Sequence, residues 1–260
     1  MAKRIEAIIR PELLIWARET AGFEMAQAAK KLQVPPERLE EWERGGDRPT
    51  MVQFRKLARI YKRPLGVFYL PEPPSDVRPL HDFRRFPGEV AGIQSPELRY
   101  EIRRAYSRRE LALDLYQAVG GPPPTFSMDA SLSDDPEVVG TAIRDTLGLR
   151  YEDQIKWAGW HEPLNVWRSA LENASVLVFQ ATTAAVTEVR GFSIGETPLP
   201  AIVMNIKDSP RGRTFTMLHE MAHLIERSHT KKFRGLVSRV IPDYEERIRW
   251  LREHGPDLDI

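Results

Sequence analysis

The sequence contains no cysteine among its 260 residues. This absence excludes a disulfide framework, a thiol nucleophile and every zinc site that depends on cysteine ligands. A metal ion in this protein therefore has to be held by histidine, aspartate or glutamate side chains.

Long apolar runs are missing as well. The apolar run at residues 176–179 is far shorter than the roughly 20 residues that cross a bilayer. No apolar segment follows the basic start Met1-Ala-Lys-Arg4, so we expect no secretory signal. The sequence predicts a cytoplasmic protein with no membrane partner.

Neither sign of charge is in large excess. The 38 Lys and Arg residues nearly balance the 37 Asp and Glu residues, so net charge does not predict a nucleic-acid partner. Residues 1–70, however, carry fourteen basic and nine acidic side chains. This local positive excess is compatible with DNA binding but does not establish it.

The first seventy residues have the apolar spacing of short helices. Apolar side chains recur every three or four positions, and glycine or proline residues separate the segments. The predicted helices span residues 12–20, 25–32, 36–44, 51–61 and 65–70. The pattern predicts an all-α domain over residues 1–72.

Proline-rich segments divide the rest of the chain. We expect a linker over residues 73–135 that contains a long helix at 95–118, followed by a domain over 136–260. In this domain the sequence predicts helices at 136–147, 163–173 and 210–225, and strands at 176–180, 187–194 and 201–206. Helices around a small sheet indicate an α+β domain.

The last predicted helix contains the motif His219-Glu220-Met-Ala-His223. Residues four apart on an α-helix lie about 40° apart around its axis, so both imidazoles leave from one face and can bind one metal ion. Neutral imidazole suits zinc, and Glu220 can take a proton from an activated water. The motif predicts zinc ligands at His219 and His223 and a catalytic base at Glu220. The alternative is a surface helix, or histidines that are hydrogen-bonded into a core.

Two strands precede this helix, one with Gly191-Phe-Ser193 and one that ends at Asn205, and the helix itself reads Arg213-Thr-Phe-Thr-Met-Leu-His219-Glu-Met-Ala-His223. Together they resemble the ImmA/IrrE family of bacterial metallopeptidases, closely over residues 160–227. The resemblance implies a zincin-like fold, a zinc cofactor, and cleavage of a protein partner such as a repressor or an antitoxin. It also implies a downstream glutamate as the third protein ligand.

The sequence departs from the family pattern where this third ligand is expected. The nearest carboxylates are Glu245 and Glu246, which lie 22 and 23 residues beyond His223. On a helix Glu245 shares its face with Arg249, so a metal-facing Glu245 would bring a cation towards zinc. We therefore predict that the third ligand is Glu246 or is absent.

The predicted helices at 25–32 and 36–44 are joined by a turn at Val34-Pro35 and followed by Gly45. Residues 10–70 thereby resemble the Cro/cI-type (XRE) helix-turn-helix. The resemblance places residues 36–43 in the major groove, with Gln27 near a backbone phosphate, and implies DNA contacts by Gln27, Arg38, Glu41 and Arg44. Because helix 36–44 is acid-rich, a docking or dimerisation role is the alternative.

We therefore expect a cytoplasmic zinc endopeptidase with a DNA-binding helix-turn-helix domain. Its partners would be operator DNA and a protein substrate, and it could form a homodimer. The alternative is a non-enzymatic DNA-binding regulator, or an antitoxin-like protein, with a degenerate peptidase domain.

Overall fold

The computed structural model describes residues 5–74, 94–128, 134–159 and 161–225. These residues form two compact units, and the boundary between the units falls inside one helix, after Arg103. Each unit has a hydrophobic core of its own. Within the described ranges, no helix is both long enough and apolar enough to cross a membrane.

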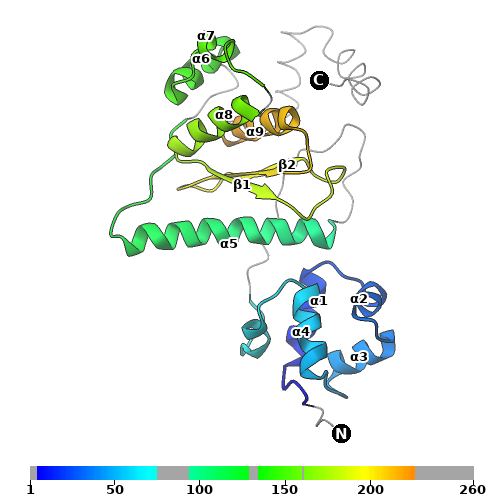
Figure 1. The fold of residues 1–260 in the computed structure, drawn as a ribbon. Coiled ribbons are helices and arrows are strands. Elements are labelled where there is room, and N and C mark those ends of the chain that lie inside the picture. Colours follow the sequence, from blue (N-terminus) through cyan, green and yellow to red (C-terminus); the bar gives the residue numbers. More distant parts are fainter. Residues whose placement is uncertain (1–4, 75–93, 129–133, 160, 226–260) are drawn as a thin grey trace. The chain divides into compact units, whose positions relative to one another are not determined.

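The first unit is all-α, as the apolar spacing predicts. Its elements are α1 (Pro11–Thr20), α2 (Met25–Leu32), α3 (Pro36–Arg44), α4 (Met51–Ile60) and the 3₁₀ helix η1 (Leu65–Tyr69) (Figure 1). Proline opens α1 and α3, where the missing amide proton costs no helical hydrogen bond. Thr50 and Gln53 form a reciprocal capping box at the start of α4.

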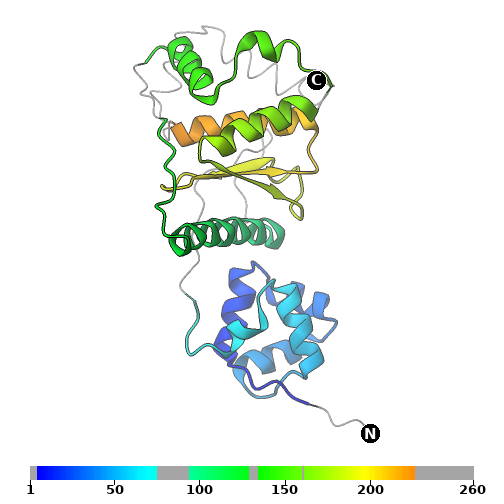
Figure 2. The same cartoon turned by 60° about the vertical axis from the view of Figure 1, so that its left-hand side comes forward.

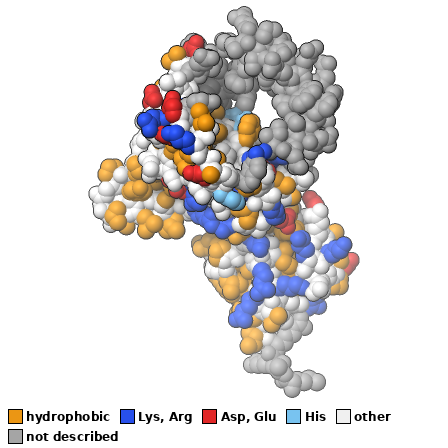
Figure 3. Space-filling view, turned by 45° about the horizontal axis from the view of Figure 1, so that its top comes forward, with side chains coloured by type: hydrophobic (Ala, Val, Ile, Leu, Met, Phe, Trp, Pro, Cys, Tyr) orange, Lys and Arg blue, Asp and Glu red, His pale blue; other side chains and the backbone are white. Residues whose placement is uncertain are grey.

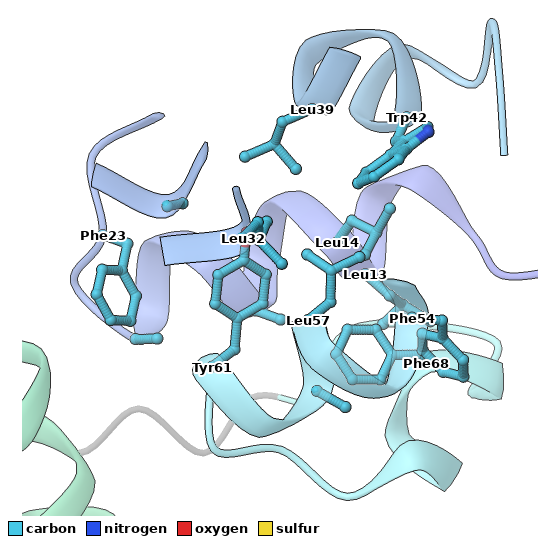
Figure 4. Packing of buried hydrophobic residues seen from close by; sticks show 14 of the residues in the cluster. Leu13, Leu14, Phe23, Leu32, Leu39, Trp42, Phe54, Leu57, Tyr61 and Phe68 are labelled. Atoms are coloured by element: carbon cyan, nitrogen blue, oxygen red, sulfur yellow. The ribbon is translucent and has the colours of Figure 1, made fainter. Parts of the chain in front are cut away.

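Apolar side chains from all four α-helices and from η1 meet in the core of the first unit (Figure 4). Phe54 packs edge-to-face against Phe68, with 5.2 Å between the ring centroids. The fully buried large side chains of this core are Leu13, Leu14, Leu39, Trp42, Phe54, Leu57, Tyr61 and Phe68. The core fixes α2 and α3 as a helix-turn-helix, joined through Gln33 in the left-handed conformation (φ 61°).

The second unit is an α+β fold, also as predicted. It holds α5 (Pro96–Ala118) from Arg104 onwards, α6 (Pro136–Leu147), α7 (Tyr151–Gln154), α8 (His161–Asn173), β1 (Leu177–Ala181), β2 (Gly191–Ile194), β3 (Ala201–Asn205) and α9 (Pro210–Ile225). The strand order is β1-β3-β2, with β1 parallel and β2 antiparallel to the central β3.

The small sheet lies between two layers of helix (Figures 1 and 2). Helices α8 and α9 pack on one face, and α5 runs along the other. On the α5 side, the buried Arg109 donates hydrogen bonds to the carbonyl oxygens of Glu196, Pro198 and Leu199. Because both faces are covered, all five residues of β3 are buried.

Strand β2 is shorter than the sequence pattern predicts. It begins at Gly191 instead of Thr187, because residues 185–189 form a turn that the side chain of Asn205 holds. The amide nitrogen Nδ2 of the buried Asn205 donates to the carbonyl oxygens of Ala184 and Val189, at 3.1 and 3.0 Å. Val189, the last residue of this turn, is therefore buried without belonging to a strand.

Candidate metal centre and helix-turn-helix surface

Helix α9 carries the histidine pair and is anchored at both ends. Ser209 caps its start by accepting a hydrogen bond from the amide of Gly212, at 3.0 Å. Met217, Met221 and Leu224 are buried in the core of the second unit. This packing fixes the rotation of α9 about its axis and so determines where His219 and His223 emerge.

The two histidines converge on one point. Their Nε2 atoms are 3.0 Å apart, and the rings stand nearly perpendicular, at 82°. Two imidazole nitrogens that bind one tetrahedral zinc ion are about 3.3 Å apart, given zinc–nitrogen bonds of about 2.0–2.1 Å. Both side chains are half-buried. The pair therefore fits two neighbouring positions of a tetrahedral metal site.

Glu220 lies between the histidines in sequence but points towards the sheet. Its side chain is 1 % exposed, and its Oε2 accepts a hydrogen bond of 2.9 Å from the Ser193 hydroxyl on β2. A carboxylate held in this way keeps one orientation beside the histidine pair, as a residue that moves protons requires.

Close packing of α9 on β2 brings Ser193 within reach of Glu220. A Cβ atom at Gly191 would lie 2.4 Å from Cγ2 of Thr216 on α9 and 2.6 Å from the carbonyl oxygen of Val203 on β3. Only glycine leaves room for this approach. Each residue of the Gly191-Phe-Ser193 segment thus contributes to the site: Gly191 allows the close approach of α9, Phe192 is fully buried in the core, and Ser193 bonds to Glu220.

Sequence reasoning noted this segment as part of a family resemblance but assigned no role to Ser193 or Gly191. The missed signal is a small residue and a hydroxyl residue two positions apart on a strand, where side chains two apart lie on the same face. The small residue leaves room for a packed helix, and the hydroxyl can form a hydrogen bond to a side chain of that helix.

Beside His219, a hollow of about 420 Å³ opens along α9. The ring of Phe215 stacks on the His219 ring at 18°, with 6.3 Å between centroids, and is 59 % exposed. The residues around the hollow are Gly159, Pro163, Arg211, Thr214, Phe215 and Leu218. The hollow thus lies on the side of His219 that the Phe215 ring covers.

Across the described ranges, no set of three His, Asp or Glu side chains is placed to hold a metal ion. Glu246, the predicted third ligand, lies outside these ranges, as do Glu245 and the other C-terminal candidate for a metal-binding side chain, His229. The structure thus shows the predicted histidine pair and leaves the third ligand untested.

The residues predicted to contact DNA lie on α2 and α3. Gln27 and Glu41 are exposed. Arg38 donates to Asp47 Oδ2 at 2.7 Å and lies over the Trp42 ring. Arg44 forms an ion pair with Glu40. Both arginines of α3 are therefore paired with carboxylates.

A buried ion pair sits behind α3. Glu43 is 6 % exposed, and its two carboxylate oxygens accept hydrogen bonds from Arg18 on α1, at 2.8 and 3.0 Å. This bidentate contact neutralises one of the four glutamates of α3. The other three, Glu37, Glu40 and Glu41, still outnumber the two arginines of α3, so the predicted recognition helix remains acidic.

Comparison with known protein families agrees with both parts of this description. A family model described as "YgjP-like, metallopeptidase domain" matches residues 206–254, and one described as "Helix-turn-helix" matches residues 14–68. The first match contains the histidine pair and continues into the C-terminal segment. No curated protein and no solved structure matched the chain. The chain thus combines a metallopeptidase-like domain with a helix-turn-helix domain, as the sequence predicts.

Proposed function

We propose that this protein is a zinc-dependent endopeptidase that cleaves a regulatory protein partner and binds DNA through its helix-turn-helix domain. The observation that carries the peptidase proposal is the convergence of the His219 and His223 Nε2 atoms beside a carboxylate that Ser193 orients. The resemblance to the ImmA/IrrE family favours a repressor or an antitoxin as the substrate.

His219 and His223 would hold the metal through their Nε2 atoms. When bound, zinc would supply Lewis-acid activation of water and of the scissile carbonyl. Glu220 would accept the proton of the attacking water and deliver it to the departing amine. Ser193, by donating to Oε2, would keep the carboxylate in the orientation that both proton transfers require. An extended substrate would add as a further strand at an edge of the sheet, which β1 and β2 form.

Two residues in the matched C-terminal segment compete for the third ligand position. Glu246 is the candidate from helix geometry, with absence of a third ligand as the alternative. His229 follows His223 by only six residues, and closing this shorter loop costs about 1 kcal/mol less than closing one of 23 residues. In zinc titrations, Glu246→Ala and His229→Ala distinguish the two, because only loss of the true ligand weakens zinc binding.

Metal analysis of the purified protein tests the proposed centre. We expect about one zinc per chain, lost in His223→Ala. Glu220→Gln should keep the zinc and lower cleavage of an unfolded protein substrate about 10²–10⁴-fold, because its amide cannot act as a base. Loss of zinc in Glu220→Gln would contradict the assigned role. A zinc-free wild type would favour the non-enzymatic regulator.

The DNA proposal rests on the helix-turn-helix and is tested separately. Binding of the protein to its own promoter region should weaken in Arg38→Ala and Arg44→Ala, and should decrease with salt. If wild-type protein shows no shift of this DNA at low salt, the docking role for the helix-turn-helix is favoured.

A further inference from the structure

The positive charge of the first unit gathers away from α3. Residues 48–71 contain six Lys or Arg side chains and no Asp or Glu, whereas α3 contains four glutamates and two arginines. On the face of this unit visible in Figure 3, Lys and Arg side chains prevail over acidic ones. An anionic partner is therefore attracted more strongly to α4 than to the predicted recognition helix.

Basic side chains of α4 and of the residues that follow it surround a hollow of about 530 Å³, which we call the basic hollow. Its basic side chains are Arg55, Arg59, Lys62 and Arg63, and its other lining residues are Ala58, Pro64, Leu65 and Tyr100. No acidic residue lines it. The hollow thus combines a cationic rim with an apolar surface.

Two arginines of the rim are available to a partner. The side chains of Arg55 and Arg59 are exposed and make no hydrogen bond or ion pair within the described part of the chain. The neighbouring Lys56 differs, because its Nζ donates to the Leu32 carbonyl oxygen and to Gln33 Oε1. Arg63 is engaged too, because it donates to the Thr20 hydroxyl and lies over the Trp16 ring, so Arg55 and Arg59 are the arginines of the rim that a ligand can pair with.

The position of these charges is unfavourable for the isolated domain. Arg55 and Arg59 lie four residues apart on α4, where like charges repel. Lys62 also has a left-handed backbone (φ 52°), whereas glycine takes such positions at Gly22 and Gly45 after α1 and α3. Its ammonium group is held over the Tyr100 ring, at 5.5 Å from the centroid.

We infer that the basic hollow binds an acidic peptide segment of a partner protein, with an apolar side chain of that segment inserted into the hollow. Carboxylates on either side of the apolar residue would pair with Arg55 and Arg59, as arginine clusters do with acidic motifs. The apolar residue would pack against Ala58, Leu65 and Tyr100. A DNA duplex offers phosphates, but the apolar group in its major groove, the thymine methyl, is much smaller than a phenylalanine ring. The inference does not depend on the metal centre.

Fluorescence anisotropy on the full-length protein tests the inference with three labelled probes. They are a peptide with acidic residues flanking a phenylalanine, the same peptide with the acids replaced by their amides, and a DNA duplex of arbitrary sequence. We expect binding of the acidic peptide, weakened by salt, and at least tenfold weaker binding of the amide peptide.

Matched variants locate the binding surface. Arg59→Glu should weaken binding of the acidic peptide at least tenfold, and Lys30→Glu, the same charge change at an exposed position of α2, should leave it within about twofold. Leu65→Asp should weaken it as well, because the apolar contact is lost. Thermal unfolding verifies that each variant is folded.

Three results would overturn the inference: equal binding of acidic and amide peptides, equal effects of Arg59→Glu and Lys30→Glu, or no peptide binding. If Arg59→Glu abolishes binding of the duplex while no peptide binds, the surface is a phosphate contact for nucleic acid instead.

Discussion

At the scale of single residues, Ser193 is the side chain that connects the sheet to the proposed chemistry. Its hydroxyl is the donor to Glu220 Oε2, from a strand 27 residues earlier in the chain. Ser193 does not reach the metal ligands, so it acts as a positioning residue, and its effect should appear in turnover and not in metal content.

We expect Ser193→Ala to retain zinc and to lower peptide cleavage about tenfold to a hundredfold. A hydrogen bond to a charged group contributes about 1.5–3 kcal/mol, and about 1.4 kcal/mol corresponds to a tenfold change in rate. Steady-state cleavage assays together with zinc analysis measure both effects. Ser193→Thr, which keeps the hydroxyl, should restore most of the activity. Unchanged cleavage in Ser193→Ala would show that the bond has no catalytic consequence.

Tyr61 is a second residue with a testable property, because its surroundings change the pKa of its phenol. Burial raises the pKa of its phenol well above the usual value, the nearby Glu43 raises it further, and Arg18 partly opposes both. Its buried Oη has no hydrogen-bond partner among the described residues. In the unfolded chain the phenol loses its proton near pH 10, whereas the folded domain retains it, so the free energy of unfolding falls as pH rises above about 10.

Tyr61→Phe should therefore keep the stability of the wild type at pH 7, since no hydrogen bond is lost. Above pH 10 its free energy of unfolding should fall less steeply than that of the wild type. Urea denaturation at a series of pH values measures the difference. Tyr69→Phe, at a tyrosine that is 53 % exposed in the same unit, is the control and should follow the wild type. Parallel curves for wild type and Tyr61→Phe would refute the argument.

At the scale of elements, the contact between β2 and α9 determines the geometry of the site. Gly191→Ala would place a methyl group against Thr216 and the Val203 carbonyl oxygen. We expect a loss of about 1–3 kcal/mol in stability, as for other overpacked cores, together with lower cleavage because Ser193 moves away from Glu220. Chemical denaturation and the cleavage assay measure the two effects.

The matched control is Gly140→Ala in α6, where an added Cβ meets no atom within 4 Å. Because alanine is the better helix former, this change should raise stability by up to about 1 kcal/mol. If both alanine variants behave alike, close packing at Gly191 is not the reason for its glycine.

The elements also show how far the sequence could predict this fold. The bounds of α2 and α3 follow directly from apolar spacing and from the residues that end each helix. The start of β2 could not be predicted, because it depends on Asn205, a residue 14 positions beyond Gly191. The His219 and His223 pair follows from helix geometry alone, whereas the Ser193 contact depends on how two elements pack.

At the scale of the whole molecule, the chain divides into two units with different chemistry. The proposed metal ligands that the structure describes belong to the second unit, and the basic hollow belongs to the first. A ligand that binds only the folded form of one unit stabilises that unit by mass action. The two sites can therefore be examined separately in the intact protein.

We expect added zinc to slow amide hydrogen exchange in α8, α9 and the sheet, and to leave the exchange of α1–α4 unchanged. Hydrogen exchange with mass spectrometry, with and without a chelator, resolves the two units in one experiment. His223→Ala is the control, since it should remove the zinc effect. A zinc effect of equal size in α4, or one that persists in His223→Ala, would speak against a metal centre at α9.

The tight contact at Gly191 also bears on how this protein can evolve. Part of the space that a larger side chain would need is occupied by a backbone oxygen, that of Val203, and not only by the methyl group of Thr216. A smaller residue at position 216 would remove one obstacle and leave the other. No single compensating substitution opens position 191 to change, so descendants that keep this packing should keep the glycine while residues around it diverge.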